Sequence, residues 1–210
     1  MWYSNGMPGR NIVKIDTADT YYHVYARGVN KQAIFLEDTD YIFFEWLLKR
    51  YLSHEAIANK RGVPYQKFHD RIALVSFCLM PNHFHLLIYQ HQTSAMQHLM
   101  RGIMSSYSRY FNTKYGRTGH LFENTYRASR IDEEKYLLHI SRYIHLNPPG
   151  WRTFPYSSIS YFANERHADW VHPEKILALF TSSDDYLTFL KEYVPTRDEL
   201  AAVKRELANK

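Results

Sequence analysis

The pattern of apolar and polar positions along the chain predicts four strands. Runs of β-branched and aromatic residues, bounded by glycine, proline or asparagine, are typical of strands. The run at 72–80 is apolar on both faces, which is typical of a central strand. A turn at Pro81-Asn82 joins this run to the next strand as a hairpin. The predicted strands are residues 21–27, 72–80, 83–89 and an extended segment at 121–131.

Apolar residues at helical spacing predict three helices around these strands. The first follows a capping segment at 38–40 and runs to about Ala58. The second begins after Ser94, which can cap it, and ends at Gly116. The third runs from Asp132 or Glu133 to about Asn147. Further helical stretches are predicted at 173–180, 184–194 and 197–208, after an aromatic loop at 151–162.

The resulting order, β-α-β-β-α-β-α, predicts a ferredoxin-like (RRM-like) α+β fold. In that fold an antiparallel sheet carries two helices on one face. The seventh element is an extra helix, and it carries Tyr143. We expect an N-terminal arm at 1–20, a core domain at 21–150, and an aromatic loop with a helical C-terminal extension at 151–210.

Composition and charge narrow the class of protein. The chain is 45% hydrophobic and 22% charged, as in ordinary globular proteins, and its net charge of +5 suits a polyanionic partner. Its single cysteine, Cys78, cannot form an internal disulfide, which favours a reducing compartment. Neither a membrane-spanning apolar run nor a signal peptide is recognisable. We therefore expect a soluble cytoplasmic protein.

Two histidines in the predicted hairpin are the first candidate for chemistry. His83 and His85 are two residues apart on a strand, so their side chains share one face, while Phe84 and Leu86 share the other. Two adjacent imidazoles can chelate a divalent metal ion. A metal site needs at least one further ligand.

The last core helix supplies both a third ligand and a nucleophile. On a helical wheel Tyr136, Tyr143 and Asn147 fall on the apolar side that docks on the sheet, whereas Arg142 and His145 point away. The Asn147 amide oxygen is a ligand that Mg²⁺ or Mn²⁺ accepts. A tyrosine beside such a metal is a candidate phosphodiester nucleophile.

Each feature also has a structural explanation of its own. A His-x-His pair can be the polar face of an amphipathic strand, and a tyrosine on an inner helix face is usually core. An asparagine before proline is a common helix stop. Only the combination of these features, in this order and on these faces, favours a catalytic role over a structural one.

Taken together, the motifs resemble a known family. The chain is similar to the single-tyrosine HUH transposases of the IS200 type, and among them to the REP-associated tyrosine transposases, over about residues 20–165. The resemblance lies in the runs Tyr22-His23-Val24 with Arg27-Gly28, Ile34-Phe35 with Asp40, Leu79 to Leu87, Tyr110-Phe111-Asn112, Gly119 to Phe122, and Tyr143 to Pro148. One departure is Pro149-Gly150-Trp151, where related chains usually carry a valine and a basic residue.

The resemblance implies roles for individual residues. Metal ligands are implied at His83 and His85, a third ligand at Asn147, and the nucleophile at Tyr143. The implied cofactor is Mg²⁺ or Mn²⁺. The implied activity is single-stranded DNA cleavage and strand transfer through a 5′-phosphotyrosine. Hairpin repeats are the expected substrate, in a bacterial, nucleoid-associated protein that is a monomer or a dimer.

Basic residues among aromatic ones are candidates for DNA contact. Cations on phosphates and rings under bases suit a single strand. In such proteins, basic residues of the N-terminal arm can read a short tetranucleotide. The candidates are Arg10, Arg27, Arg101, Arg109, Lys114, Arg117, Arg127 and Arg130.

Two other functions remain open at this point. A His-x-His metallohydrolase would need the pattern His-x-His-x-Asp-His, but Leu87 and Ile88 occupy its last two positions. A ferredoxin-like RNA-binding module would read bases with exposed aromatic side chains on its sheet and would need no metal.

Overall fold

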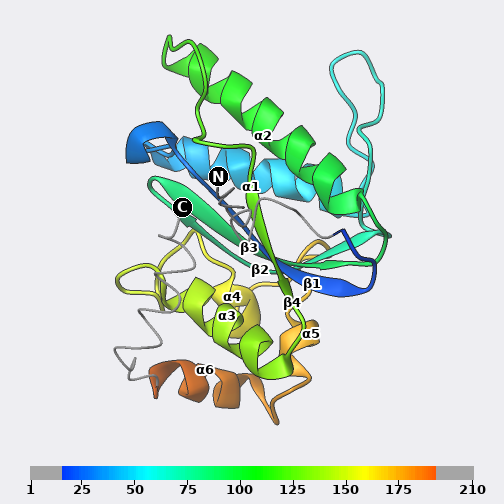
Figure 1. Ribbon diagram of the computed structural model, residues 1–210, viewed down its shortest axis with the longest axis vertical. Helices are drawn as coiled ribbons and strands as arrows, with labels where there is room; N and C mark the ends of the chain where they lie inside the picture. The colour runs from blue at the N-terminus through cyan, green and yellow to red at the C-terminus, as the bar shows by residue number, and fades with distance from the viewer. Residues whose placement is uncertain (1–15, 193–210) are drawn as a thin grey trace, which may run out of the picture.

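The computed structural model describes residues 16–192, which are built around a four-stranded antiparallel sheet (Figure 1). The strands lie in the order β2-β3-β1-β4, and this confirms the ferredoxin-like α+β prediction. Their bounds are β1 Thr20–Arg27, β2 Ile72–Met80, β3 His83–Gln90 and β4 Arg127–Ile131.

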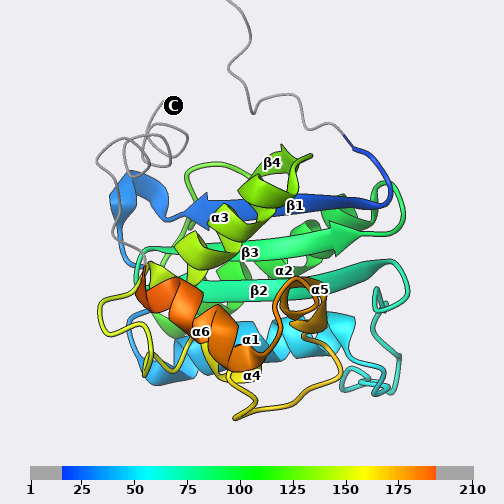
Figure 2. The same cartoon turned by 90° about the horizontal axis from the view of Figure 1, so that it is seen from below.

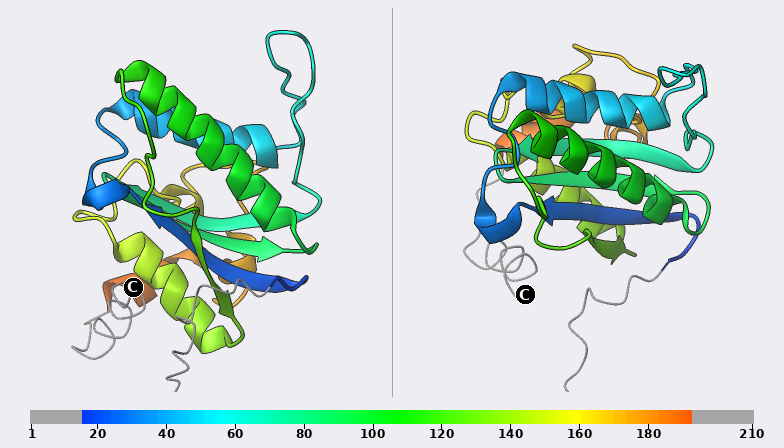
Figure 3. Two further views of the ribbon diagram at one scale, coloured as in Figure 1. Left: turned by 45° about the horizontal axis from the view of Figure 1, so that its top comes forward. Right: turned by 90° about the horizontal axis from the view of Figure 1, so that it is seen from above.

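Helices cover both faces of the sheet. The first two, α1 (Asp38–Leu52) and α2 (Ala95–Lys114), lie side by side on one face (Figure 3), and α3 (Glu134–Leu146) crosses the other (Figure 2). The short elements are η1 Val29–Lys31, α4 Ile159–Phe162, α5 Glu174–Leu177 and α6 Ser183–Lys191. Because α6 packs on the outer side of α3, that helix has protein on two sides (Figure 1).

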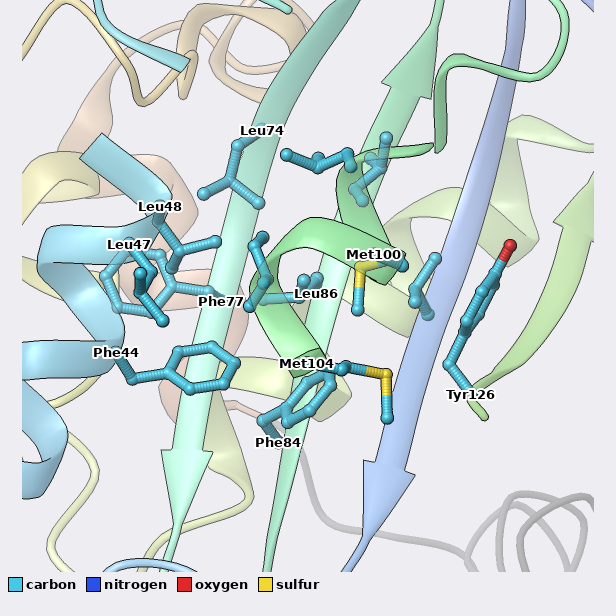
Figure 4. Close-up of a cluster of buried hydrophobic side chains, with 14 of the residues drawn as sticks. Phe44, Leu47, Leu48, Leu74, Phe77, Phe84, Leu86, Met100, Met104 and Tyr126 are labelled. Carbon is cyan, nitrogen blue, oxygen red and sulfur yellow. The ribbon is translucent and has the colours of Figure 1, made fainter. Parts of the chain in front are cut away.

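Alternation along β3 divides the core into two layers. Phe84 and Leu86 point into the layer under α1 and α2, where Phe84 meets Phe44 of α1 with ring centroids 5.0 Å apart (Figure 4). Leu87 points into the layer under α3. The period of two therefore sends His83 and His85 to the α3 side, as predicted.

The prediction that residues 72–80 form a central strand was wrong, because β2 is the edge of the sheet. One edge of β2 pairs with β3, and its other edge is covered by the segment that follows α3. Leu79 N–H donates to the Tyr156 carbonyl at 2.9 Å, and Ser158 N–H donates to the Phe77 carbonyl at 2.9 Å. Because β2 is covered on its free edge and on both faces, it is apolar throughout, and its sequence resembles that of a central strand.

Several element boundaries also differ from the predictions. Helix α1 ends at Leu52 and not near Ala58, and only 127–131 of the extended segment is strand. Ser94 occupies the N-cap of α2 but makes no capping bond. Instead the Asp16 carboxylate accepts the Ser94 N–H at 2.7 Å.

The remaining predictions on the chain ends lie outside the described residues. These are most of the N-terminal arm and the helix at 197–208. Between residues 16 and 192, no helix combines the length and apolar character that a bilayer span requires.

Candidate active site

The hairpin places the two predicted histidines under α3. The rings of His83 and His85 lie with centroids 4.9 Å apart, and His85 is buried while His83 is partly exposed. Arg27 of β1 is the cross-strand partner of His83, so its side chain belongs to the same face. The structure thus brings together a pair of imidazoles and one arginine.

Helix α3 lays Tyr143 over these imidazoles. The ring of Tyr143 meets that of His85 edge-on, with centroids 5.3 Å apart. Asn147, the C-cap residue of α3, lies one turn beyond Tyr143, and its side chain hydrogen-bonds both Tyr143 and His83. The four residues predicted to act together are therefore neighbours in the fold.

Burial keeps both histidines neutral at physiological pH. It lowers the pKa of His83 to about 4, helped by the positive charge of Arg27 and opposed by the hydrogen bond to Asn147. Burial also holds the pKa of His85 well below its ordinary value, and His83, His23 and Arg27 act in the same direction. Neutral imidazoles are the form that binds a metal.

The nucleophile candidate is held in its protonated form. Burial raises the pKa of the Tyr143 phenol to about 12, while the hydrogen bond to Asn147 and the charge of Arg27 lower it. A phenolate at this position needs more positive charge than the described protein groups supply. A divalent cation bound beside the ring would supply it.

The structure adds a third histidine to the site, His23 of β1, to which the sequence analysis gave no chemical role. His23 is buried, and its Nε2 lies 2.9 Å from Nδ1 of His85, with the two rings stacked at 5.0 Å. The run Tyr22-His23-Val24 was noted only as part of the family pattern. Its signal was the alternation along β1, which puts His23 and Arg27 on one face.

The donor set fits a divalent metal ion. Nε2 of His85 is buried and has no hydrogen-bond partner, although nearly all buried polar atoms have one. His83 and His85 would hold the ion through ring nitrogens and Asn147 through its amide oxygen. Within residues 16–192 no group of three or more His, Cys, Asp or Glu side chains is placed to bind a metal, and in this candidate site the third ligand would be the amide.

The predicted DNA-binding residues fall into separate groups. Arg27 and Arg127 share the α3 face of the sheet and line one small pocket with Tyr25 and Tyr126. Arg101 and Arg109 are exposed on α2, which packs on the opposite face. Of the basic candidates within residues 16–192, only Arg27 and Arg127 lie with the histidines.

The other basic candidates have partners of their own. Lys114 contacts Asp40 and Glu37, each at 2.6 Å, and Arg130 is ion-paired with Asp132. The Arg117 guanidinium lies over the ring of Phe111 at 5.6 Å. Arg10 is outside the described residues.

The second side of α3 is buried as well. The helical wheel placed His145 away from the face that carries Tyr143, and there the C-terminal segment covers it. Nδ1 of His145 lies 2.7 Å from the hydroxyl of Tyr186 in α6, and its Nε2 lies 2.7 Å from Oγ of Ser158, which also hydrogen-bonds the Phe77 backbone of β2. This chain of bonds fixes α3 between the sheet and α6.

The buried imidazoles make stability depend on pH. Burial lowers the pKa of His23 and of His145 to about 3, whereas the unfolded chain has the ordinary value near 6.5. Their contribution is complete above pH 6.5 and is lost as the pH falls toward 3, because only the unfolded chain takes up protons. In EDTA, we expect His23 and His145 each to lower the free energy of unfolding by about 1.4 kcal/mol when the pH falls from 7.5 to 5.5. Urea titrations at the two pH values measure the total loss, to which His83 and His85 also contribute, and His145→Gln should reduce that total by about 1.4 kcal/mol. Equal unfolding free energies at both pH values would contradict it.

Comparison with known proteins finds a family model that matches part of the chain. Residues 63–147 match the family model described as transposase, IS200-like. Over this segment the chain is therefore similar to the IS200-like transposases. The matched range contains His83, His85, Tyr143 and Asn147, and the resemblance noted in the sequence is confirmed. Similarity to a transposase family model indicates a DNA-processing enzyme.

Two solved structures resemble the chain, and the first of them shares its fold. One is a REP-associated tyrosine transposase bound to a REP hairpin, with a TM-score of 0.53 and 15% identity over 76% of this chain and 90% of that one. A second, a proposed transposase from Deinococcus radiodurans R1, has a TM-score of 0.38 and 15% identity over 63% of this chain and 93% of that one. No curated protein matches the sequence significantly. At this identity the first likeness shows the fold alone.

Proposed function

We propose that the protein is a metal-dependent single-stranded DNA endonuclease and strand transferase. The observation that supports this most is the position of Tyr143, edge-on to the ring of His85 and hydrogen-bonded to Asn147, which also reaches His83. A phenol, two neutral imidazoles and an amide are the groups that metal-assisted attack on a phosphodiester requires.

In the proposed reaction the Tyr143 oxygen attacks phosphorus in line with the 3′-oxygen. The new bond joins the tyrosine oxygen to the 5′-phosphate, the bond from phosphorus to the 3′-oxygen breaks, and the phenol proton ends on the 3′-hydroxyl. A bound divalent ion would neutralise charge on the phosphate. Since the phosphotyrosine keeps the energy of the broken bond, a 3′-hydroxyl can reverse the step and rejoin DNA without ATP.

The protein's own residues have separate tasks in this scheme. Asn147 orients the Tyr143 hydroxyl, and Arg27 adds positive charge where the phosphate must lie. The bonds from His145 to Ser158 and Tyr186 hold the orientation of α3. In this proposal residues 21–150 carry the chemistry and the following segment braces the nucleophile.

The structure weighs against both alternative functions. A ferredoxin-like RNA-binding module needs an open sheet face, but α3 covers this one, and Tyr25 and His23 are only 8% and 3% exposed. A metallohydrolase of the pattern His-x-His-x-Asp-His needs an aspartate and a third histidine in β3, where this chain has Leu87 and Ile88, both buried.

A covalent-trapping assay tests the proposal. The full chain is incubated with end-labelled single-stranded DNA that contains a hairpin, with Mn²⁺, and resolved under denaturing conditions. We expect label that migrates with the protein and a free 3′-hydroxyl on the released strand. Cleavage without any protein-linked label would refute the tyrosine mechanism.

The form of the DNA should affect binding more than its charge does. Single strands with a hairpin should bind about tenfold or more tightly than blunt duplex of equal length at physiological salt, because partly exposed rings such as Trp151 and Phe154 can stack only on unpaired bases. Fluorescence anisotropy with both forms measures the difference. Equal affinities would indicate nonspecific phosphate attraction.

A further inference from the structure

We infer that His23 is a positioning residue that sets the tautomer of His85 and so prepares its Nε2 to bind a metal ion. The inference rests on the proposed metal site and adds a residue to it. His23 lies on β1, beside the strand that carries the two proposed ligands, and its cross-strand partner is Leu87.

The contact between the two histidines holds a single proton. Nε2 of His23 and Nδ1 of His85 are 2.9 Å apart, a normal hydrogen-bond length, so one nitrogen donates and the other accepts. If His85 donates, its proton is on Nδ1 and its Nε2 carries a lone pair. If His23 donates, the proton of His85 is on Nε2, where it blocks a metal.

Burial limits the freedom of this pair. His23 is 3% exposed and His85 is 1% exposed, and the rings are nearly parallel at 24° with centroids 5.0 Å apart. The ring of Tyr25 stacks on His23 at 5.3 Å and also lies 5.8 Å from the ring of His85. Neither ring can turn without disturbing a packed layer, so the hydrogen bond persists.

The orphaned nitrogen of His85 indicates which way the proton lies. Nε2 of His85 is buried with no hydrogen-bond partner. An N–H there would be an unpaired buried donor, whereas a lone pair there is completed when a cation binds. The geometry therefore favours the tautomer with the proton on Nδ1 and His23 as its acceptor, the arrangement by which outer groups orient metal-binding histidines.

Metal binding in the absence of DNA tests the inference. We compare Mn²⁺ affinity of the full-length wild type, His23→Phe and His23→Gln by calorimetry at pH 7.5. Phenylalanine keeps a ring but lacks the acceptor, so Mn²⁺ should bind about 10- to 100-fold more weakly. Glutamine can place a carbonyl oxygen near the position of Nε2, and affinity within about threefold of the wild type is expected.

Two controls separate positioning from packing. Tyr22→Phe changes an equally buried residue on the opposite face of β1 and should leave Mn²⁺ affinity unchanged. Nitrogen-15 NMR of the metal-free wild type should show the His85 proton on Nδ1. This measurement stands even where His23→Phe folds poorly.

The outcomes distinguish this inference from the proposed function. Wild-type Mn²⁺ affinity in folded His23→Phe, or a His85 proton on Nε2, would overturn the role of His23 and leave the metal site in place. Absence of Mn²⁺ binding by the wild type would overturn the metal site and this inference together. Mn²⁺ binding without a covalent DNA adduct would refute only the proposed function.

Discussion

Tyr143→Phe is expected to abolish the covalent protein–DNA adduct. The substitution removes the oxygen proposed to attack phosphorus and keeps the ring that packs on His85 at 5.3 Å. The hydroxyl hydrogen-bonds Asn147, and loss of this bond should change the unfolding free energy by only about 1 kcal/mol. Trapping of labelled single-stranded hairpin DNA in Mn²⁺, with a thermal melt of each variant, measures both effects.

Tyr136→Phe is the matched control for this prediction. Tyr136 lies on α3 two turns before Tyr143, and its ring stacks on His139 at 6.4 Å rather than on the site histidines. This variant should form adduct at the wild-type level. Peptide mapping of the wild-type adduct should place the nucleotide on the peptide that contains Tyr143. Finding it on Tyr136, or recovering adduct from Tyr143→Phe, would refute the assignment.

Removal of either proposed histidine ligand should abolish DNA cleavage. Loss of groups that only orient a metal ligand costs about 10- to 100-fold, so loss of a ligand itself should cost at least roughly a hundredfold. His83→Ala is the cleaner variant because His83 is partly exposed, while His85→Ala also leaves a cavity and deprives His23 of its partner. Hairpin DNA binding should persist in both, because phosphate and stacking contacts remain.

The metal requirement has its own control. The wild type should lose cleavage in EDTA and regain it when Mn²⁺ is added in excess. His54→Ala removes a histidine in the segment after α1 whose ring lies 4.3 Å from that of His69, and this variant should cleave like the wild type. Full activity of His83→Ala, or of the wild type in EDTA, would exclude the metal assignment.

Local rules determined most of the fold and the faces of the site. The period of two in β3 put His83 and His85 together, and the period of 3.6 in α3 put Asn147 one turn from Tyr143. Both periods are properties of backbone geometry, so they can be counted along the chain. The order of elements then specified a ferredoxin-like sheet.

Other features depend on contacts between segments far apart in the chain, which periodicity does not encode. The position of β2 at the sheet edge was missed because residues 156–158 cover that edge. The buried side of α3 was missed because α6 supplies Tyr186, 41 residues beyond His145.

By itself, the sequence determined which residues share a strand face or a helix face. These shared faces identified the candidate nucleophile and the candidate metal ligands. Only the tertiary structure decided that His23 contacts His85, that Arg27 joins the site while Arg101 and Arg109 lie behind the sheet, and that Lys114 is ion-paired. The physical reason is that faces follow from local backbone repeats, whereas neighbours across strands and layers follow from how the whole chain buries its apolar surface.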